Sequence, residues 1–386
     1  MRFRVTAEYG LLLDIDSGSV GAAIVSSPHD PEASEILWMI REELPLRSHV
    51  VFEEASKDLR SGIHSVCKKS GDEGVRALKR VHSNAHLNTI LVRIAAPWAF
   101  TVTKSAYAKH EKDFSVTPDI LHALERRATD EAREACAQKD NEPLNTLTMI
   151  ANETVGVTIN GYRVRGSKLG RAANVGLTEL IEFTFEDLKE AIDDAVSRSF
   201  PAAAISLHTA IGTYATALSS LHLSMNDASL LIIGSEATEL GIVRNGVLQH
   251  TTYTPYGMRT LARELRDNAG LSLEDALAYM RRGEIDHQAT QEKIDEVLGL
   301  YETNLVELFE RAGDSLLLPK TVFMHADPAA AAFFSKRIGR AIAHLTGNTP
   351  MVHSITSQHF GTGETDTGFL LGSRAFHEKE PQNMSA

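Results

Sequence analysis

The sequence predicts an α/β protein made of two like halves, with a small α+β module inserted into the first half. Two similar hairpins indicate the duplication: residues 11–27 (LLLDIDSGSVGAAIVSS) and residues 229–250 (SLLIIGSEATELGIVRNGVLQH). Each has an apolar strand, a turn of small and acidic residues, and a second apolar strand. Such a turn exposes backbone N–H groups that can hold phosphate oxygens. We therefore expect the two halves to face each other across a phosphate-binding cleft.

The composition is that of a globular protein, with 43% hydrophobic and 23% charged residues. A chain of 386 residues fits several subdomains. The net charge of -12 argues against a nucleic-acid or anionic-membrane surface, and so against nucleic-acid partners and direct membrane insertion. Cys67 and Cys136 have no C-x-x-C spacing, which argues against a disulfide framework or zinc site. Without a signal-peptide pattern or a membrane-spanning apolar run, we expect a cytoplasmic protein.

The first half is expected in two segments, 1–86 and 186–222. Its predicted strands are 11–25, 50–54 and 203–208, its helices are 55–70, 185–199 and 210–221, and its loops are 68–74 and 82–86.

The inserted α+β module is predicted over residues 87–185, in the order strand, helix, strand, strand. A helix over 115–138 begins at Thr117 and Pro118, since proline suits the first helical turn. Asn160-Gly161 predicts a two-residue hairpin turn. The predicted strands are 87–100, 147–159, 162–164 and 177–185.

The second half is expected over 223–256 and 321–376, with a helical subdomain over 257–320 and a polar, disordered tail over 377–386. Ser272 and Asp275 predict a helix start. The predicted helices are 257–268, 272–282, 288–312, 329–345 and 368–375, and 321–325 is a predicted strand.

The order of these elements resembles the actin-like (ribonuclease H-like) ATPase superfamily. The insert lies inside the first half, which resembles the FtsA/PilM branch of division and type IV pilus scaffolds. Local stretches are similar to that branch: INGYRVRGSKLG at 159–170, HTTYTPYGMRTLARELRDNAGLSLEDAL at 250–277, and GFLLG at 368–372. The resemblance covers about residues 11–375. It implies duplicated actin-like halves and a divergent member of the branch.

The resemblance also implies a site for ATP and Mg²⁺. Asp14 would lie near the magnesium ion, and the hydroxyls of Ser17 and Ser19 would face phosphates. Asp16 stands where the family has glycine, so a carboxylate meets the phosphate charge. The candidate nucleotide-binding residues are Asp14, Asp16, Ser17, Gly18, Ser19, Gly234, Ser235 and Thr238.

Four departures from the family pattern argue against ATP hydrolysis. The second turn has Ile232 for the metal-orienting aspartate and Glu236 for a glycine. The nucleoside helix aligns as residues 276–280, without the usual Glu and Lys, and the strand end at 323–328 has no glycine. His208-Thr209 aligns with the usual Glu-Pro. Because hydrolysis needs positioned metal and water, no catalytic residue is assigned. Two alternatives stay open: nucleotide binding without turnover, and a cleft that keeps its shape without the ligand.

Simpler interpretations accompany the individual candidates. Asp14 and Asp16 also fit a hairpin turn with solvated acids, and an exposed turn is favoured for Glu236 and Glu239. His325 and Asp327 fit a helix-start turn better than a catalytic pair. Trp98 fits the core or its rim, with a partner-binding anchor as the alternative.

The leading hypothesis is a scaffold that links a membrane machine to the cytoplasm. By resemblance, a membrane protein's cytoplasmic peptide or a division or pilus protein docks by the insert, and subunits stack into filaments. The ending AFHEKEPQNMSA lacks the apolar face of a membrane-binding helix, so a partner would recruit the protein to the inner face of the membrane. The alternatives are an ATP-hydrolysing FtsA-like polymer, a sugar-kinase-like enzyme and a non-polymerising regulator.

Overall fold

The computed structural model describes residues 8–27, 35–137, 147–164, 170–221, 225–283, 291–313, 318–362 and 365–383. Parts of the predicted segments lie outside these residues, among them 138 of the helix predicted over 115–138, 165–169 of the family-like stretch, 288–290 of a predicted helix, and 384–386 of the tail.

Two five-stranded sheets, one in each half, share the same topology within the described residues. In each, a three-strand antiparallel meander is followed by two parallel strands. The first sheet has the order β3 (Ile36–Glu43), β2 (Ser19–Ser27), β1 (Glu8–Ile15), β4 (Thr89–Ile94), β9 (Ala204–Thr209). The second has the order β12 (Val247–Thr254), β11 (Thr238–Arg244), β10 (Asp227–Ile233), β13 (Thr321–His325), β14 (Met351–Ser354). The predicted duplication is confirmed.

The central strands are buried on both faces, which explains their unbroken apolar runs. On β1, Leu11 and Leu13 enter one core while Leu12 enters another. The outer face of the first sheet packs against α1 (Phe52–Lys69) and α4 (Glu186–Ser199). The inner faces of both sheets share a core with α5 (Ala210–Ser220) and α10 (Thr367–Asn383). This shared core joins the two halves.

The outer face of the second sheet is covered by helices. They form one core with it around Leu265, Tyr301 and Phe334. The helices are α6 (Met258–Ala269), α7 (Leu273–Arg282), α8 (Gln291–Arg311) and α9 (Ala331–Thr346). Ser272 caps α7, as predicted, by accepting a hydrogen bond from the backbone N–H of Asp275.

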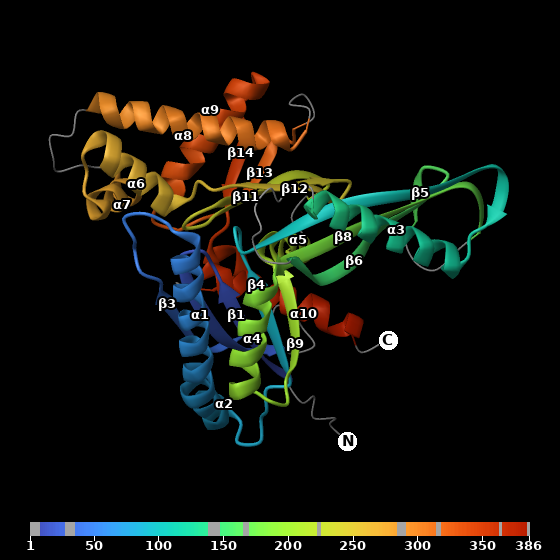
Figure 1. The fold of residues 1–386 in the computed structure, drawn as a ribbon, viewed down its shortest axis with the longest axis horizontal. Helices are drawn as coiled ribbons and strands as arrows, with labels where there is room; N and C mark the ends of the chain where they lie inside the picture. Colours follow the sequence, from blue (N-terminus) through green and yellow to red (C-terminus); the bar gives the residue numbers. More distant parts are fainter. Residues whose placement is uncertain are drawn as a thin grey trace.

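The inserted module extends sideways from the junction of the two halves (Figure 1). Its antiparallel sheet has the order β5 (Ala99–Ser115), β8 (Arg171–Phe185), β6 (Leu147–Ile159), β7 (Tyr162–Val164), and α3 (Pro118–Ala137) packs on one face. Asn160 and Gly161 form the predicted hairpin turn with φ of 50° and 84°. Asn245 and Gly246 repeat it between β11 and β12 with φ of 51° and 71°.

Several sequence predictions are corrected. Residues 50–54 are not a strand: α1 begins at Phe52, and the strand of this region is β3. The polar stretch 68–74 is not a loop, because α1 continues through a π turn (Ser70–Gly74) into α2 (Val75–Val81). Its inward residues are small: Gly74 lies where a Cβ atom would be 2.9 Å from the Trp38 ring.

The ends of the insert and of the chain also differ from expectation. Residues 89–94, expected in the insert, form β4 inside the first sheet, and the insert's own sheet begins at Ala99. The helix α10 continues to Asn383, so most of the tail expected to be disordered is helical. Strands β12 and β14, a short 3₁₀ helix at Ser357–Phe360 and the length of β5 were not foreseen.

Candidate functional site

The two candidate phosphate turns have the same geometry. Each follows the central strand of its sheet and leaves four residues between paired strand ends. In the first turn, the backbone N–H of Asp16 donates to the carbonyl of Ser19 at 3.0 Å. In the second, Gly234 donates to Ala237 at 2.9 Å. The sequence prediction of two like turns is confirmed by this geometry.

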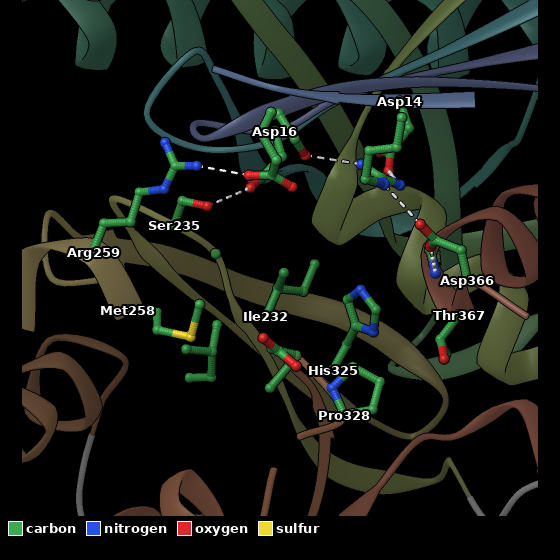
Figure 2. Close-up of a pocket in the computed structure, with 18 of the residues that line it drawn as sticks. Asp14, Asp16, Ile232, Ser235, Met258, Arg259, His325, Pro328, Asp366 and Thr367 are labelled. Atoms are coloured by element: carbon green, nitrogen blue, oxygen red, sulfur yellow. Dashed lines mark hydrogen bonds and ion pairs between the residues drawn. The ribbon is translucent and has the colours of Figure 1, made fainter. Parts of the chain in front are cut away.

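These two turns contact each other across the cleft. The backbone N–H of Glu236 donates to Oγ of Ser17 at 2.9 Å, and Oγ of Ser235 donates to Oδ2 of Asp16 at 3.1 Å. Figure 2 shows Asp16 and Ser235 pointing toward each other from opposite walls. Gly18 allows the close approach, because a Cβ atom there would lie 2.1 Å from Oγ of Ser235. Two donors of the second turn, the N–H of Glu236 and the hydroxyl of Ser235, are therefore already used within the protein.

Asp14 is buried at the end of β1 and is held by two arginines. Its Oδ2 accepts from Arg41 at 2.7 Å, and its Oδ1 accepts from Arg93 on the adjacent strand β4 at 3.0 Å. Arg41 also pairs with Asp366 at 2.7 Å and donates to Oγ of Ser19 at 3.0 Å. Burial alone would raise the pKa of Asp14, but the charges of Arg93 and Arg41 outweigh it and lower that pKa. Asp14 is thus an ionised, fully paired carboxylate and not a solvated turn residue.

The equivalent position in the second half is apolar. Ile232 is buried, and its parallel neighbour on β13 is His325. Burial and the charge of Arg93 lower the pKa of His325 to about 4, so its imidazole is neutral at pH 7. Ile232, His325 and Asp14 all line the cleft (Figure 2). The second half therefore contributes no carboxylate at this point.

The two glutamates of the second turn are not exposed, contrary to expectation. Glu236 is partly buried and forms an ion pair with Arg263 and a hydrogen bond with Thr260 at 2.9 Å. Glu239 is buried on β11 and accepts from the backbone N–H of Ala96 in the first half at 3.0 Å. Burial raises the pKa of Glu239 to about 7, despite that hydrogen bond and the charge of Arg93.

The eight candidate nucleotide-binding residues separate into two sets. Asp14, Asp16, Ser19, Gly234 and Ser235 line the cleft, whose volume is about 600 Å³. Ser17, Gly18 and Thr238 do not. Ser17 lines a smaller neighbouring pocket, and Thr238 is buried and donates to the carbonyl of Tyr256 at 2.6 Å.

The nucleoside side of the cleft is crossed by an ion pair. Arg281 on α7 binds Asp327, which follows β13, at 2.9 Å. Asp327 also accepts from the backbone N–H of Ala329 at 2.9 Å, which fits the predicted helix-start turn. His208 and Thr209 do not line the cleft; they make contacts with the insert and with α5. Thr209 caps α5, and His208 binds Glu182 at 2.7 Å.

Sequence reasoning missed the basic residues of this site. Arg41, Arg93 and Arg259 line the cleft with Asp366. Arg259 donates to the carbonyl of Leu44 at 3.0 Å and so joins α6 to the first half. Arg93 left a signal, because it is a lone charge in the apolar stretch TILVRI, and buried charges need partners. Arg41 and Arg259 lie in polar stretches of the sequence, so their burial could not be predicted in the same way.

The residues do not fit a magnesium nucleotide. Mg²⁺ is bound through carboxylate oxygens and water, yet both oxygens of Asp14 are taken by guanidinium groups, which repel a cation. Ile232 offers no oxygen. Phosphate oxygens need free N–H and O–H donors, and those of Glu236 and Ser235 are already bonded. Among the residues that the structure covers, no cluster of three or more His, Cys, Asp or Glu residues is arranged to hold a metal.

A smaller pocket of about 180 Å³ lies beside the first turn, where the insert leaves the first half. Trp98 is buried there, only 3% exposed, and its ring lies 5.3 Å from that of Phe52. Trp98 therefore belongs to the core and to a pocket wall at once. The other apolar residues of the wall are Leu44, Pro45, Val50, Phe52, Ala55 and Pro97. No helix in the described ranges is both long and apolar enough for a membrane span.

No protein-family model matches this chain, and no curated protein matches it in sequence. Solved structures do. A PilM–PilN type IV pilus biogenesis complex matches with a TM-score of 0.58 and 12% identity, over 95% of this chain and 98% of that one. An actin-like ATPase-fold protein of unknown function from Bacteroides thetaiotaomicron matches with a TM-score of 0.48 and 9% identity, over 97% and 98%. The ethanolamine utilization protein EutJ from Carboxydothermus hydrogenoformans matches with 0.44 and 12%, over 95% and 89%.

The chain therefore has the actin-like ATPase fold, as a divergent example of it, and the predicted fold class is confirmed. Within that fold it is similar to PilM over nearly its whole length. Proteins with this fold generally bind a nucleotide and Mg²⁺. In this chain, the cleft is lined by Arg41, Arg93 and Arg259 together with Asp14 and Asp366.

Proposed function

We propose that this protein is a scaffold of the PilM type, which links a membrane machine to the cytoplasm through protein–protein contacts. The observation that carries the proposal is the match to the PilM–PilN complex over 95% of this chain, insert included. The residues of the cleft support it, because Asp14 and Ile232 do not provide the metal and water positions that ATP hydrolysis needs.

The proposed partner is a short cytoplasmic peptide of a membrane protein, and the small pocket beside Trp98 is its docking point. The pocket has apolar walls, and Arg47 and Asp58 at its rim form an ion pair at 2.8 Å. Val50 and Val51 beside it are each about half exposed, which is unusual for apolar side chains in a row. Buried aromatic anchors with a polar rim are typical of peptide-binding hot spots.

The proposed location is the cytoplasmic face of the membrane, where the partner recruits the scaffold. Its net charge of -12 opposes direct binding to anionic lipid, so recruitment through protein contacts is favoured. Self-association into filaments is part of the same proposal, as is a role in either pilus assembly or division. Deletion of the gene separates the two roles: loss of pili supports the first, and blocked septation supports the second.

Peptide binding tests the proposal directly. The probes are fluorescent peptides copying the cytoplasmic ends of membrane proteins encoded beside this gene, measured by anisotropy against scrambled versions. We expect one peptide to bind with a micromolar Kd, and Val50→Asp to weaken it by about tenfold or more. Leu300→Asp is the matched control, because Leu300 is an exposed apolar residue of α8 (58% exposed, against 49% for Val50) that does not line the small pocket. Equal binding by genuine and scrambled peptides would contradict the proposal.

A further inference from the structure

The cleft has three parts that the family resemblance assigns to metal, phosphate and nucleoside. In each part, groups of the chain itself bind one another. In the metal part, Arg41 and Arg93 surround Asp14. In the phosphate part, the two turns bind each other. In the nucleoside part, Arg281 on α7 binds Asp327. The same substitution of internal contacts for ligand contacts therefore occurs three times.

Asp16 behaves as an internal anion in the phosphate part. Its Oδ2 accepts from the hydroxyl of Ser235 at 3.1 Å and lies 3.4 Å from the backbone N–H of Gly18. A hydroxyl and an N–H of a tight turn are the kinds of donor that hold phosphate oxygens. A further donor of the second turn, the N–H of Glu236, is bonded to Ser17. The carboxylate thus satisfies the donors that a phosphate group would otherwise take.

The arginines behave as the internal cation. Two guanidinium groups contact the two oxygens of Asp14, and Arg41 extends the contact to Asp366 at the start of α10. Asp366 in turn accepts from the backbone N–H of Gly368 at 2.8 Å. Charge neutralisation that a divalent ion would supply therefore comes from side chains, with bidentate-capable donors that hold their geometry.

These contacts also join the two halves. The bonds Ser17–Glu236 and Asp16–Ser235 cross the cleft directly. Arg259 on α6 reaches Glu43 at 2.7 Å at the end of β3 in the first half. Glu239 reaches Ala96 in the same direction at 3.0 Å. No single bond is strong, but several hydrogen-bonded charges across one interface hold a defined closure.

We infer that internal groups hold the two halves in one closed arrangement around the remaining cavity of about 600 Å³, in which Asp16 takes the place of phosphate and Arg41 with Arg93 takes the place of the metal. The closed arrangement of the halves then needs no magnesium nucleotide and does not change with it. A partner would therefore bind one permanent conformation, and its binding would not depend on nucleotide. This goes beyond the scaffold function, because a scaffold could equally be nucleotide-switched.

Electron–electron distance measurements across the cleft test this inference. Spin labels go to Met39→Cys on β3 and Leu300→Cys on α8, both exposed positions on opposite halves. The native thiols Cys67 and Cys136 are buried. We expect one narrow distance distribution that stays the same with Mg²⁺ and ATP and with a chelator. A broad distribution that narrows on adding Mg²⁺ and ATP overturns the inference.

Two variants examine the internal groups themselves. Ser235→Ala removes one cross-cleft hydroxyl bond, and Arg41→Gln removes the charge between Asp14 and Asp366. Both should broaden the distribution, by about twofold for Arg41→Gln. Arg337→Gln is the matched control, because its ion pair with Glu302 lies within the second half. If Arg41→Gln does not fold, Ser235→Ala decides, and an unchanged distribution in it overturns the inference.

Nucleotide binding is measured on the same full-length protein with a fluorescent ATP analogue. We expect no saturable binding up to about 1 mM, with or without Mg²⁺, because both oxygens of Asp14, the N–H of Glu236 and the hydroxyl of Ser235 are already bonded. Saturable binding in the micromolar range that strengthens with Mg²⁺ overturns the inference. It would leave peptide binding at the small pocket unaffected, so the two proposals fail separately.

Discussion

The two halves share a sheet order and a turn but differ at the second-last residue of the central strand, one residue before the strand end. In the first half this position is Asp14, next to Arg93 on the parallel strand. In the second half it is Ile232, next to His325. Strand register makes the pairs equivalent, since Ile15 and Ile233 end their strands opposite the same point of the turn.

The difference shows two ways to fill one buried position without a metal ion. The first half keeps the carboxylate and surrounds it with guanidinium groups, because a buried charge needs a partner. The second half replaces the carboxylate with a hydrocarbon side chain beside a neutral imidazole, so no charge has to be paired there. The fold therefore tolerates either solution, and neither provides a vacant metal ligand.

Replacing Arg93, the neighbour of Asp14, should cause the largest loss in the free energy of unfolding. Arg93→Met leaves one oxygen of Asp14 buried without its partner, at a cost of about 3–5 kcal/mol in the free energy of unfolding. Urea unfolding followed by circular dichroism measures it. The equivalent change in the second half, His325→Met, should cost less than about 1.5 kcal/mol, because a neutral side chain is replaced by an apolar one. Similar losses for both variants would contradict the view that only the first half has a buried charge that needs a partner at this position.

Introducing the acid into the second half should be next in size. Ile232→Asp buries a carboxylate whose neighbour on the adjacent strand is His325 and not an arginine, and it should destabilise the protein by about 3–4 kcal/mol. Adding His325→Arg transplants the first pair and should recover at least about 1 kcal/mol of that loss. The double-mutant cycle in urea gives the coupling. Strictly additive losses would mean that the pairing of neighbouring strands does not set this difference.

Much of the fold could be predicted from the sequence, because apolar strands around small turns occur twice and Asn160-Gly161 has a fixed turn preference. The edge strands β3 and β14 could not, since their half-buried residues give weak patterns. At the site, the turns were predictable, but their contact with each other was not. That contact depends on how α5 and α10 bring the two sheets together, which local pattern does not encode.

The same limit applies to Glu239, whose burial gives a pH test of the second half. Its folded pKa of about 7 lies above the ordinary glutamate value of 4.5, so the unfolded state ionises first as pH rises. Wild-type stability should therefore fall between about pH 4.5 and 7, by about 3 kcal/mol from this group.

Glu239→Gln removes the titration and keeps an oxygen for Ala96. Its stability relative to wild type should rise over that pH interval by about 2–3 kcal/mol and stay constant above about pH 8. Urea midpoints at several pH values measure this difference. Gly21 is the equivalent position of the first half, so no glutamate titrates there. A difference between variant and wild type that does not vary with pH would exclude the burial of Glu239 as its cause.

The ion pair on the nucleoside side should have the smallest effect on stability. Arg281 is nearly half exposed, so its pair with Asp327 is screened by water, and Arg281→Ala should cost less than about 1 kcal/mol. Added salt should reduce the difference further, because screening weakens exposed pairs. Arg93→Met should keep most of its effect in the same salt, since Asp14 is buried. Urea unfolding of both variants at low and high salt separates the two kinds of pair. Equal salt dependence would mean that Asp14 and its arginines are as exposed to solvent as the pair of Arg281 and Asp327. The two ion-pair sites would then not differ in their burial from water.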